Sequence, residues 1–181
     1  MVVHTAAPFF EETRIGDDAE ILARVKAYRD ATKFLARSAI RNEVPKIVMT
    51  GAASSVVGAH PLKDDDTSHY ADATQWVDQH TFDKPNEKSK LVAEKTCWNE
   101  VLAADPRSKT SLSTVLPYFV VGQPLFKESF NSSCSSILKI INNEQYGFPE
   151  VHLPIVDVED VAAAHVACIT FKGENTRHLL A

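Results

Sequence analysis

The sequence has 181 residues, of which 44% are hydrophobic and 24% charged, so a single globular domain spanning 1–181 is expected and a disordered chain is excluded. The net charge of −5, with basic residues spread along the chain, favours neither nucleic acid nor an anionic membrane as a partner. Three widely spaced cysteines without a CxxC pair argue against a disulfide framework and a zinc site, and favour a reducing, cytoplasmic compartment.

Short apolar runs rich in β-branched residues alternate with helical patterns along the chain. The runs suit strands that are buried on both faces of a parallel sheet, and they lie at 1–6, 46–51, 111–117 and 151–158. Helices are predicted at 17–40, 86–104, 132–143 and 158–171. The alternation predicts a doubly wound, Rossmann-like α/β sheet with right-handed crossovers. The polar stretch 59–85 is predicted to be a surface loop.

The chain begins with an apolar strand, whereas nucleotide-binding sheets of this kind open with a strand, a glycine-rich turn and a helix. Its six glycines never form GxGxxG or GxxxxGK, so these residues contain no phosphate cradle. The first ten residues lack a basic region and include Pro8, so neither a signal peptide nor a membrane span is expected. We expect a partial sheet. If nothing precedes Met1, its first strand faces water or a partner, with a homo-oligomer through that edge left open.

Lys90 differs from the other lysines of the predicted helix at 86–104. At roughly 100° per residue, Lys90 and Asn86 point to the apolar side of the helix, while Lys88 and Lys95 fall on the polar side. The apolar side consists of Leu91, Ala93, Cys97, Trp98, Val101 and Leu102. A lysine in such a place must be paired, reach water along its stem, or face a ligand.

The segment NEKSKLVAEKTCW, which contains Lys90, resembles the active-site helix YxKSKxxAExxxW of the dihydroflavonol-reductase-like group. This group belongs to the extended short-chain dehydrogenases/reductases, within the NAD-dependent epimerase/dehydratase superfamily. Four further segments are similar to motifs of that group in the same order: VVHTAAP, KIVMTGAASSVVG, LPYFVVGQPL and IVDVEDVAAAH. The resemblance implies that the chain covers the family from its fourth strand onward, with 123–181 as the small substrate-side portion.

The resemblance implies that Lys90 matches the lysine that holds the nicotinamide ribose of NADP or NAD and lowers the pKa of a proton-donating tyrosine. Asn86 stands at the position of that tyrosine, and Ala52 at the position of the serine that orients the substrate carbonyl. An amide is no general acid near neutral pH, and a positioned acid contributes roughly 10²- to 10⁴-fold to the rate.

The family's cofactor-side positions correspond to His4, Ala6 and Pro117. The resemblance therefore implies a nicotinamide cofactor and a small-molecule carbonyl substrate, with cofactor binding weakened by the missing glycine turn. From the residues alone, His4 is equally well explained as a structural histidine, and Pro117 as a proline that ends a strand.

Two other groups of residues are candidate sites. The acidic residues and histidines of the stretch 59–85 fit no metal-ligand spacing, so a solvated loop and no metal site is predicted. His165 lies in an apolar helix pattern and is predicted to be a core histidine whose ring nitrogens are satisfied.

Three hypotheses follow for the function. The first is a truncated and catalytically degenerate relative of NADP-dependent ketone and aldehyde reductases. The second is a non-enzymatic binding or scaffolding protein that pairs through its exposed sheet edge. The third is an incomplete product of a longer reductase gene.

Overall fold

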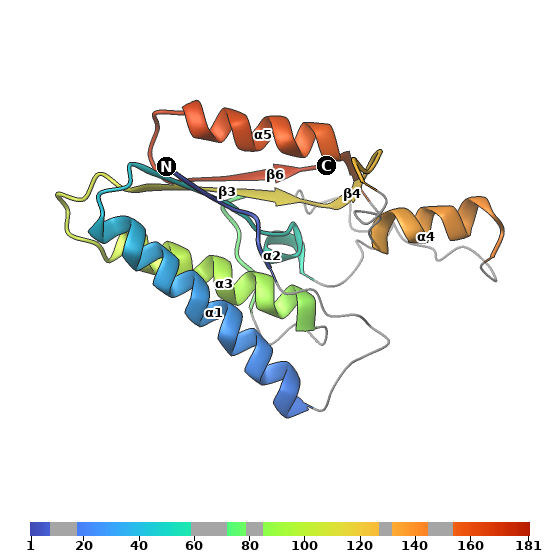
Figure 1. Ribbon diagram of the computed structural model, residues 1–181, viewed down its shortest axis with the longest axis horizontal. Coiled ribbons are helices and arrows are strands. Elements are labelled where there is room, and N and C mark those ends of the chain that lie inside the picture. The colour runs from blue at the N-terminus through green and yellow to red at the C-terminus, as the bar shows by residue number, and fades with distance from the viewer. Residues whose placement is uncertain (8–17, 59–71, 79–84, 127–131, 145–153) are drawn as a thin grey trace.

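The structure is a computed structural model of the chain (Figure 1). The residues that it describes are 1–7, 18–58, 72–78, 85–126, 132–144 and 154–181. Among these residues, no helix combines the length and the apolar character needed to cross a membrane.

A four-stranded, fully parallel sheet organises the described residues, with the strand order β1-β2-β3-β6. Its strands are β1 (Val2–His4), β2 (Lys46–Thr50), β3 (Ser111–Pro117) and β6 (Thr176–Leu180). The two central strands are almost entirely buried, because their apolar side chains are covered on both faces of the sheet. This arrangement confirms the prediction of a partial, Rossmann-like α/β fold.

Helices cover the two faces of the sheet unequally (Figure 1). Helices α1 (Asp18–Arg41) and α3 (Pro85–Leu102) pack against each other on one face, where Ile47, Met49 and Leu112 form the main core with them. Helix α5 (Val158–Thr170) lies alone on the other face, above a smaller cluster of Val48, Val115 and Cys168. The first face therefore buries the larger core.

The helix boundaries follow from local signals in the sequence. The Asp157 side chain caps α5 by accepting a hydrogen bond from the Glu159 backbone N–H at 2.7 Å. Helix α1 ends in a left-handed turn at Glu43 (φ 51°), where the Val44 N–H donates to the Ala39 carbonyl at 2.9 Å. All four predicted helices are present within two residues of their expected ends.

A second, two-stranded parallel sheet pairs β4 (Phe119–Val121) with β5 (Ile155–Asp157). Of the strand predicted at 151–158, the structure describes 154–158. A strand is present there, but it joins the smaller sheet, so the expectation that it belongs to the main sheet is wrong. Helix α4 (Ser132–Ile141) lies beside β4, at the end of the molecule seen on the right of Figure 1. The fourth strand of the main sheet is β6, whose sequence TRHLL lacks a continuous apolar run.

Strand β1 forms one edge of the main sheet within the described residues. It pairs with β2 through only three residues. Val3 points to the same face of the sheet as Val48, the face on which α5 lies, and is 43% exposed. Val2 and His4 point to the opposite face and are half-buried there.

Candidate functional site

The carboxyl ends of the parallel strands bring several predicted site residues to one end of the sheet. His4 ends β1 and lies opposite Met49 of β2, while Pro117 ends β3. The chain leaving β2 is tied to β3, since the Ala53 N–H donates to the Pro117 carbonyl at 3.0 Å. Ala52 immediately precedes this bond, so the positions expected to flank the substrate carbonyl and the cofactor are neighbours. Carboxyl ends of parallel strands are where such sheets bind ligands.

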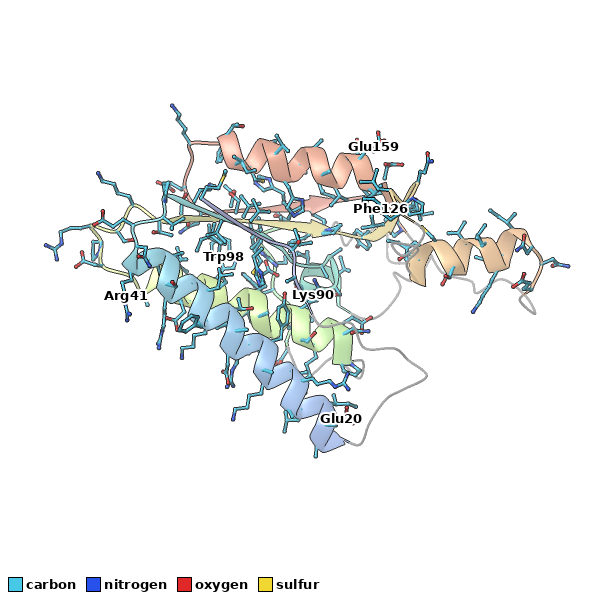
Figure 2. The ribbon with its side chains drawn as sticks, in the orientation of Figure 1. Glu20, Arg41, Lys90, Trp98, Phe126 and Glu159 are labelled. Carbon is cyan, nitrogen blue, oxygen red and sulfur yellow. The ribbon has the colours of Figure 1, made fainter. Side chains whose placement is uncertain are left out.

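Helix α3 presents Lys90 at this end of the sheet, beside the short helix α2 (Ser54–Val57) (Figure 2). Asn86 lies one turn earlier, and its carbonyl accepts a hydrogen bond from the buried Ser89 hydroxyl at 2.8 Å. The Lys90 side chain is half-buried, and among the described residues it makes no hydrogen bond or ion pair. Burial lowers the pKa of Lys90 because no partner offsets the desolvation of its charge.

His4 lies close enough to Lys90 to respond to its charge. The pKa of His4 is lowered by burial and, to a smaller degree, by the positive charge of Lys90. Its ring lies 6.1 Å from the ring of Tyr28 on α1, and its Nε2 atom is buried without a hydrogen-bond partner in the described part of the chain. Burial raises the pKa of Tyr28 to about 12, so this phenol is a poor proton donor. The structure thus brings His4 and Lys90 together.

The serine position of the family is not restored by the neighbouring serines. Ala52 is half-buried and has no hydroxyl, while Ser54 and Ser55 follow it on α2. Both hydroxyls are buried and lack a partner among the described residues, and Ser55 is completely enclosed. Ala6 is exposed in the segment beyond β1, and no contact of its side chain joins it to this group.

A buried ion pair behind the site was missed by the sequence analysis. Arg177 of β6 donates to Glu94 of α3 through Nε at 2.8 Å, and the two side chains are 5% and 0% exposed. The Thr114 hydroxyl donates to the same carboxylate at 3.1 Å. A Cβ on Gly51 would lie 3.4 Å from Glu94 Oε2, so the pair packs against the residue before Ala52. Glu94 follows Lys90 by one helical turn, so the periodicity that singled out Lys90 could also have indicated that Glu94 faces the interior.

Arg177 also holds the segment 72–78 against the body of the protein. Its Nη1 donates to the Ala73 carbonyl at 2.6 Å and to the Gln75 carbonyl, and its guanidinium carbon lies 3.6 Å from the centre of the Trp76 ring. Lys95 donates to the Val77 carbonyl at 2.8 Å and lies above the same ring. Lys95, predicted to lie on the polar side of the helix, is covered there by this segment.

His165 is a structural histidine, as predicted. Its Nδ1 lies 2.7 Å from the Val161 carbonyl, which can only accept, so Nδ1 carries the proton. Its Nε2 lies 2.6 Å from the Thr50 hydroxyl and accepts from it. No group of three metal-binding side chains occurs among the described residues. Most of the acidic loop weighed as a metal site lies outside them, including Asp64, Asp65, Asp66, His69 and His80.

Comparisons with known proteins agree with the resemblance drawn from the sequence, although no protein-family model matches the chain. Cinnamoyl-CoA reductase CAD2 of Medicago truncatula is 29% identical over 182 residues, which cover 99% of this chain and 52% of that protein. NADPH-dependent methylglyoxal reductase GRE2 of Saccharomyces cerevisiae is 24% identical over 187 residues, covering 97% of this chain and 53% of that protein.

The fold agrees as well. The crystal structure of Gre2 from Candida albicans in complex with NADPH superimposes with a TM-score of 0.71 at 27% identity, covering 99% of this chain and 55% of that chain. The chain spans about half the length of the curated relatives that it matches. In sequence and fold the chain is thus similar to extended short-chain dehydrogenases/reductases, among them cinnamoyl-CoA and methylglyoxal reductases.

Proposed function

We propose that this chain carries the carbonyl-reductase site of its family in a catalytically degenerate form. The observation that carries the proposal is the state of Lys90, which is half-buried beside His4 and has no partner among the described residues, with an amide at Asn86 one turn away. A reductase of this family would hold a phenol where Asn86 stands. The lysine of the site is thus present without the proton donor that it would serve.

Lys90 and His4 fit the ribose end of a nicotinamide cofactor. The Lys90 ammonium can donate to ribose hydroxyls, and the buried, partnerless His4 Nε2 can accept from one. NADPH is favoured over NADH, since GRE2 of yeast is named NADPH-dependent and the Candida structure contains NADPH. When bound, the cofactor supplies a hydride to the carbonyl carbon. The diphosphate has no glycine-rich turn in these 181 residues, so weak binding is expected.

Reduction is expected to be slow for two independent reasons. Asn86 cannot deliver a proton to the alkoxide at neutral pH, which removes roughly 10²- to 10⁴-fold in rate. Ala52 cannot donate a hydrogen bond to the carbonyl oxygen, and the enclosed Ser55 hydroxyl does not replace it. A small aldehyde or ketone remains the substrate class that this arrangement would accept.

The test begins with NADPH binding, measured by calorimetry on the purified chain and on Lys90→Met, for which weaker binding is expected. NADPH consumption is then followed with a panel of aldehydes and ketones, comparing the chain with Asn86→Tyr/Ala52→Ser. The double variant should gain turnover, and the gain should vanish when Lys90→Met is added. Turnover at ordinary enzyme rates by the unaltered chain would contradict degeneracy, and a double variant without gain would show that these two positions are not what limits the site.

A second candidate function is non-enzymatic pairing through the edge strand β1. It is favoured by the three-residue pairing of β1 with β2 and by the 43% exposure of Val3. We expect a dimer in light scattering that dissociates in Val3→Lys, with Val48 and its buried neighbours undisturbed. A chain that is monomeric and folded before the substitution would exclude this function.

A further inference from the structure

Two of the described lysines have amines that are shielded from water and have no carboxylate partner among the described residues. Lys46 is 6% exposed, and its Nζ has no hydrogen-bond partner among the described residues. Lys90 is half-buried and likewise unpaired. The pKa of each is lowered by burial, so each amine is neutral more often than that of a lysine in water. A neutral amine is the nucleophilic form of lysine.

The residues around Lys90 leave its amine without a charged partner among the described residues. Glu94, one turn further along the same face of α3, is taken by Arg177 and by the Thr114 hydroxyl. On β1, His4 is the residue whose pKa is lowered by the charge of Lys90. Its imidazole carries no negative charge that could pair with the lysine. Asn86, one turn before Lys90, is an amide. No carboxylate is therefore recorded as a partner of Lys90 within the described chain.

Access separates Lys90 from the other candidates. Lys46 is closed in beneath α5, with its amine 5.5 Å from the centre of the Phe171 ring. Lys95 is reachable, but its amine donates to the Val77 carbonyl at 2.8 Å and lies over Trp76. Lys90 alone among these three combines partial exposure with an amine that no described group engages.

We propose that the ε-amine of Lys90 forms a reversible imine with small aldehydes, so that this end of the sheet binds carbonyl compounds covalently and without a cofactor. The amine nitrogen attacks the carbonyl carbon, and a C–N bond forms as the carbonyl π bond opens onto oxygen. The C–O bond then breaks, and the oxygen leaves as water with the two protons that the amine nitrogen loses. The sequence of steps involves neither oxidation nor reduction. It uses the same end of the sheet as the proposed function but does not depend on it.

The test traps the imine irreversibly. The folded chain is incubated at neutral pH with propanal and sodium cyanoborohydride, which reduces the imine to a propylated lysine, and labelled sites are timed by peptide mass spectrometry. Because burial lowers the pKa of Lys90, a larger share of its amine is neutral at pH 7, so Lys90 should be labelled faster than the exposed Lys26. Lys46 should stay unlabelled until the chain is unfolded with urea.

Matched variants decide the outcome. The fast site should disappear in Lys90→Met and persist in Lys88→Met, with circular dichroism confirming that both remain folded. Labelling of Lys90 no faster than Lys26, or a fast site that survives in Lys90→Met, would overturn the inference. Added NADPH separates the two proposals: protection of Lys90 supports the cofactor role as well, while fast labelling that NADPH leaves unchanged supports the imine and counts against cofactor binding.

Discussion

The two ends of the main sheet each hold a lysine without a carboxylate partner, yet they differ in what surrounds it. Lys46 is the first residue of β2, at the amino end of the sheet, where the C-terminal end of α5 and the Phe171 ring cover it. Lys90 lies at the carboxyl end beside His4, where it stays partly open to water. Burial lowers the pKa of both amines. Desolvation alone therefore does not distinguish a chemical site from a structural cost, and access to the amine does.

The neighbours of the two lysines show why the ends differ. At the amino end, the Ser113 and Thr176 hydroxyls satisfy each other through a 2.9 Å hydrogen bond, while Lys46 Nζ and Thr110 Oγ1 have no partner among the described residues. At the carboxyl end, His4 Nε2 and the hydroxyls of Ser54 and Ser55 have no partner in the described part of the chain. Polar groups left unsatisfied at the ligand-binding end of a parallel sheet are a feature of functional sites, where a ligand supplies the missing bonds.

The largest effect is expected from loosening the carboxyl end. Arg177→Met leaves the enclosed Glu94 carboxylate without its partner and should cost about 3–5 kcal/mol of unfolding free energy in urea titrations. Arg107→Met, which breaks the exposed pair with Asp105, is the control and should leave the midpoint unchanged. Adding Glu94→Leu to Arg177→Met should recover part of the loss. A loss below about 1 kcal/mol in the single variant would show that the pair is not needed.

Lys46→Met sharpens the contrast at the amino end. Removing an amine that is buried without a partner should raise the unfolding free energy by about 1–3 kcal/mol at pH 7. Because the pKa of Lys46 is lower in the folded than in the unfolded chain, its cost is present at low pH and fades as the pH rises toward 10.5. Urea titrations at pH 7 and pH 10 should show the benefit shrinking, and a benefit independent of pH would contradict this account.

Two side chains in the core between α1 and α3 also make the free energy of unfolding depend on pH in the alkaline range. Burial raises the pKa of Cys97 from 9.0 to about 12, so the unfolded chain loses this proton first and stability falls as the pH rises above 9. Cys97→Ala should lower stability at pH 7 through lost packing but remove a slope of about 1.4 kcal/mol per pH unit above pH 9. Tyr28→Phe should remove a similar slope above pH 10. Unfolding midpoints measured between pH 7 and pH 11 check both slopes.

The smallest effect is expected from the turn that leads into the amino end of β2. Glu43 holds a positive φ of 51°, which glycine adopts without strain, so Glu43→Gly should stabilise the chain by about 0.5–1 kcal/mol. Asn143 makes the same turn after α4 at φ 56° and should gain less on replacement, because asparagine tolerates this conformation. Thermal unfolding compares the two variants. Trapping of Lys90 by propanal should be unchanged in both, since the altered turns lie away from the carboxyl ends of the strands.

The sequence predicted the helices and three of the four main strands because their apolar periodicity is local and strong. It failed at β6, since TRHLL is only five residues long, begins with three polar residues, and is a strand only because it pairs with β3, about 63 residues away. It also placed 151–158 in the main sheet, because an apolar run does not reveal which sheet it joins. Pairing partners are a tertiary property that composition does not encode.

The candidate site was predictable up to the point where tertiary partners matter. Helical periodicity singled out Lys90, and the family motif identified Asn86 and Ala52. Neither signal could reveal that Lys90 lacks a partner or that Arg177 reaches Glu94, because those facts depend on β6. The proximity of His4 to Lys90 likewise arises from the register of β1 against β2.

The Glu94–Arg177 pair also has a consequence for the order in which the chain folds. Arg177 follows Glu94 by 83 residues, so during synthesis the Glu94 carboxylate is made well before its partner exists. At about 5–20 residues per second, that delay lasts roughly 4 to 17 seconds. Until β6 docks, the Glu94 carboxylate beside β3 has no positively charged partner, and burying it without one is unfavourable. Closure of the core is thereby coupled to the synthesis and docking of β6.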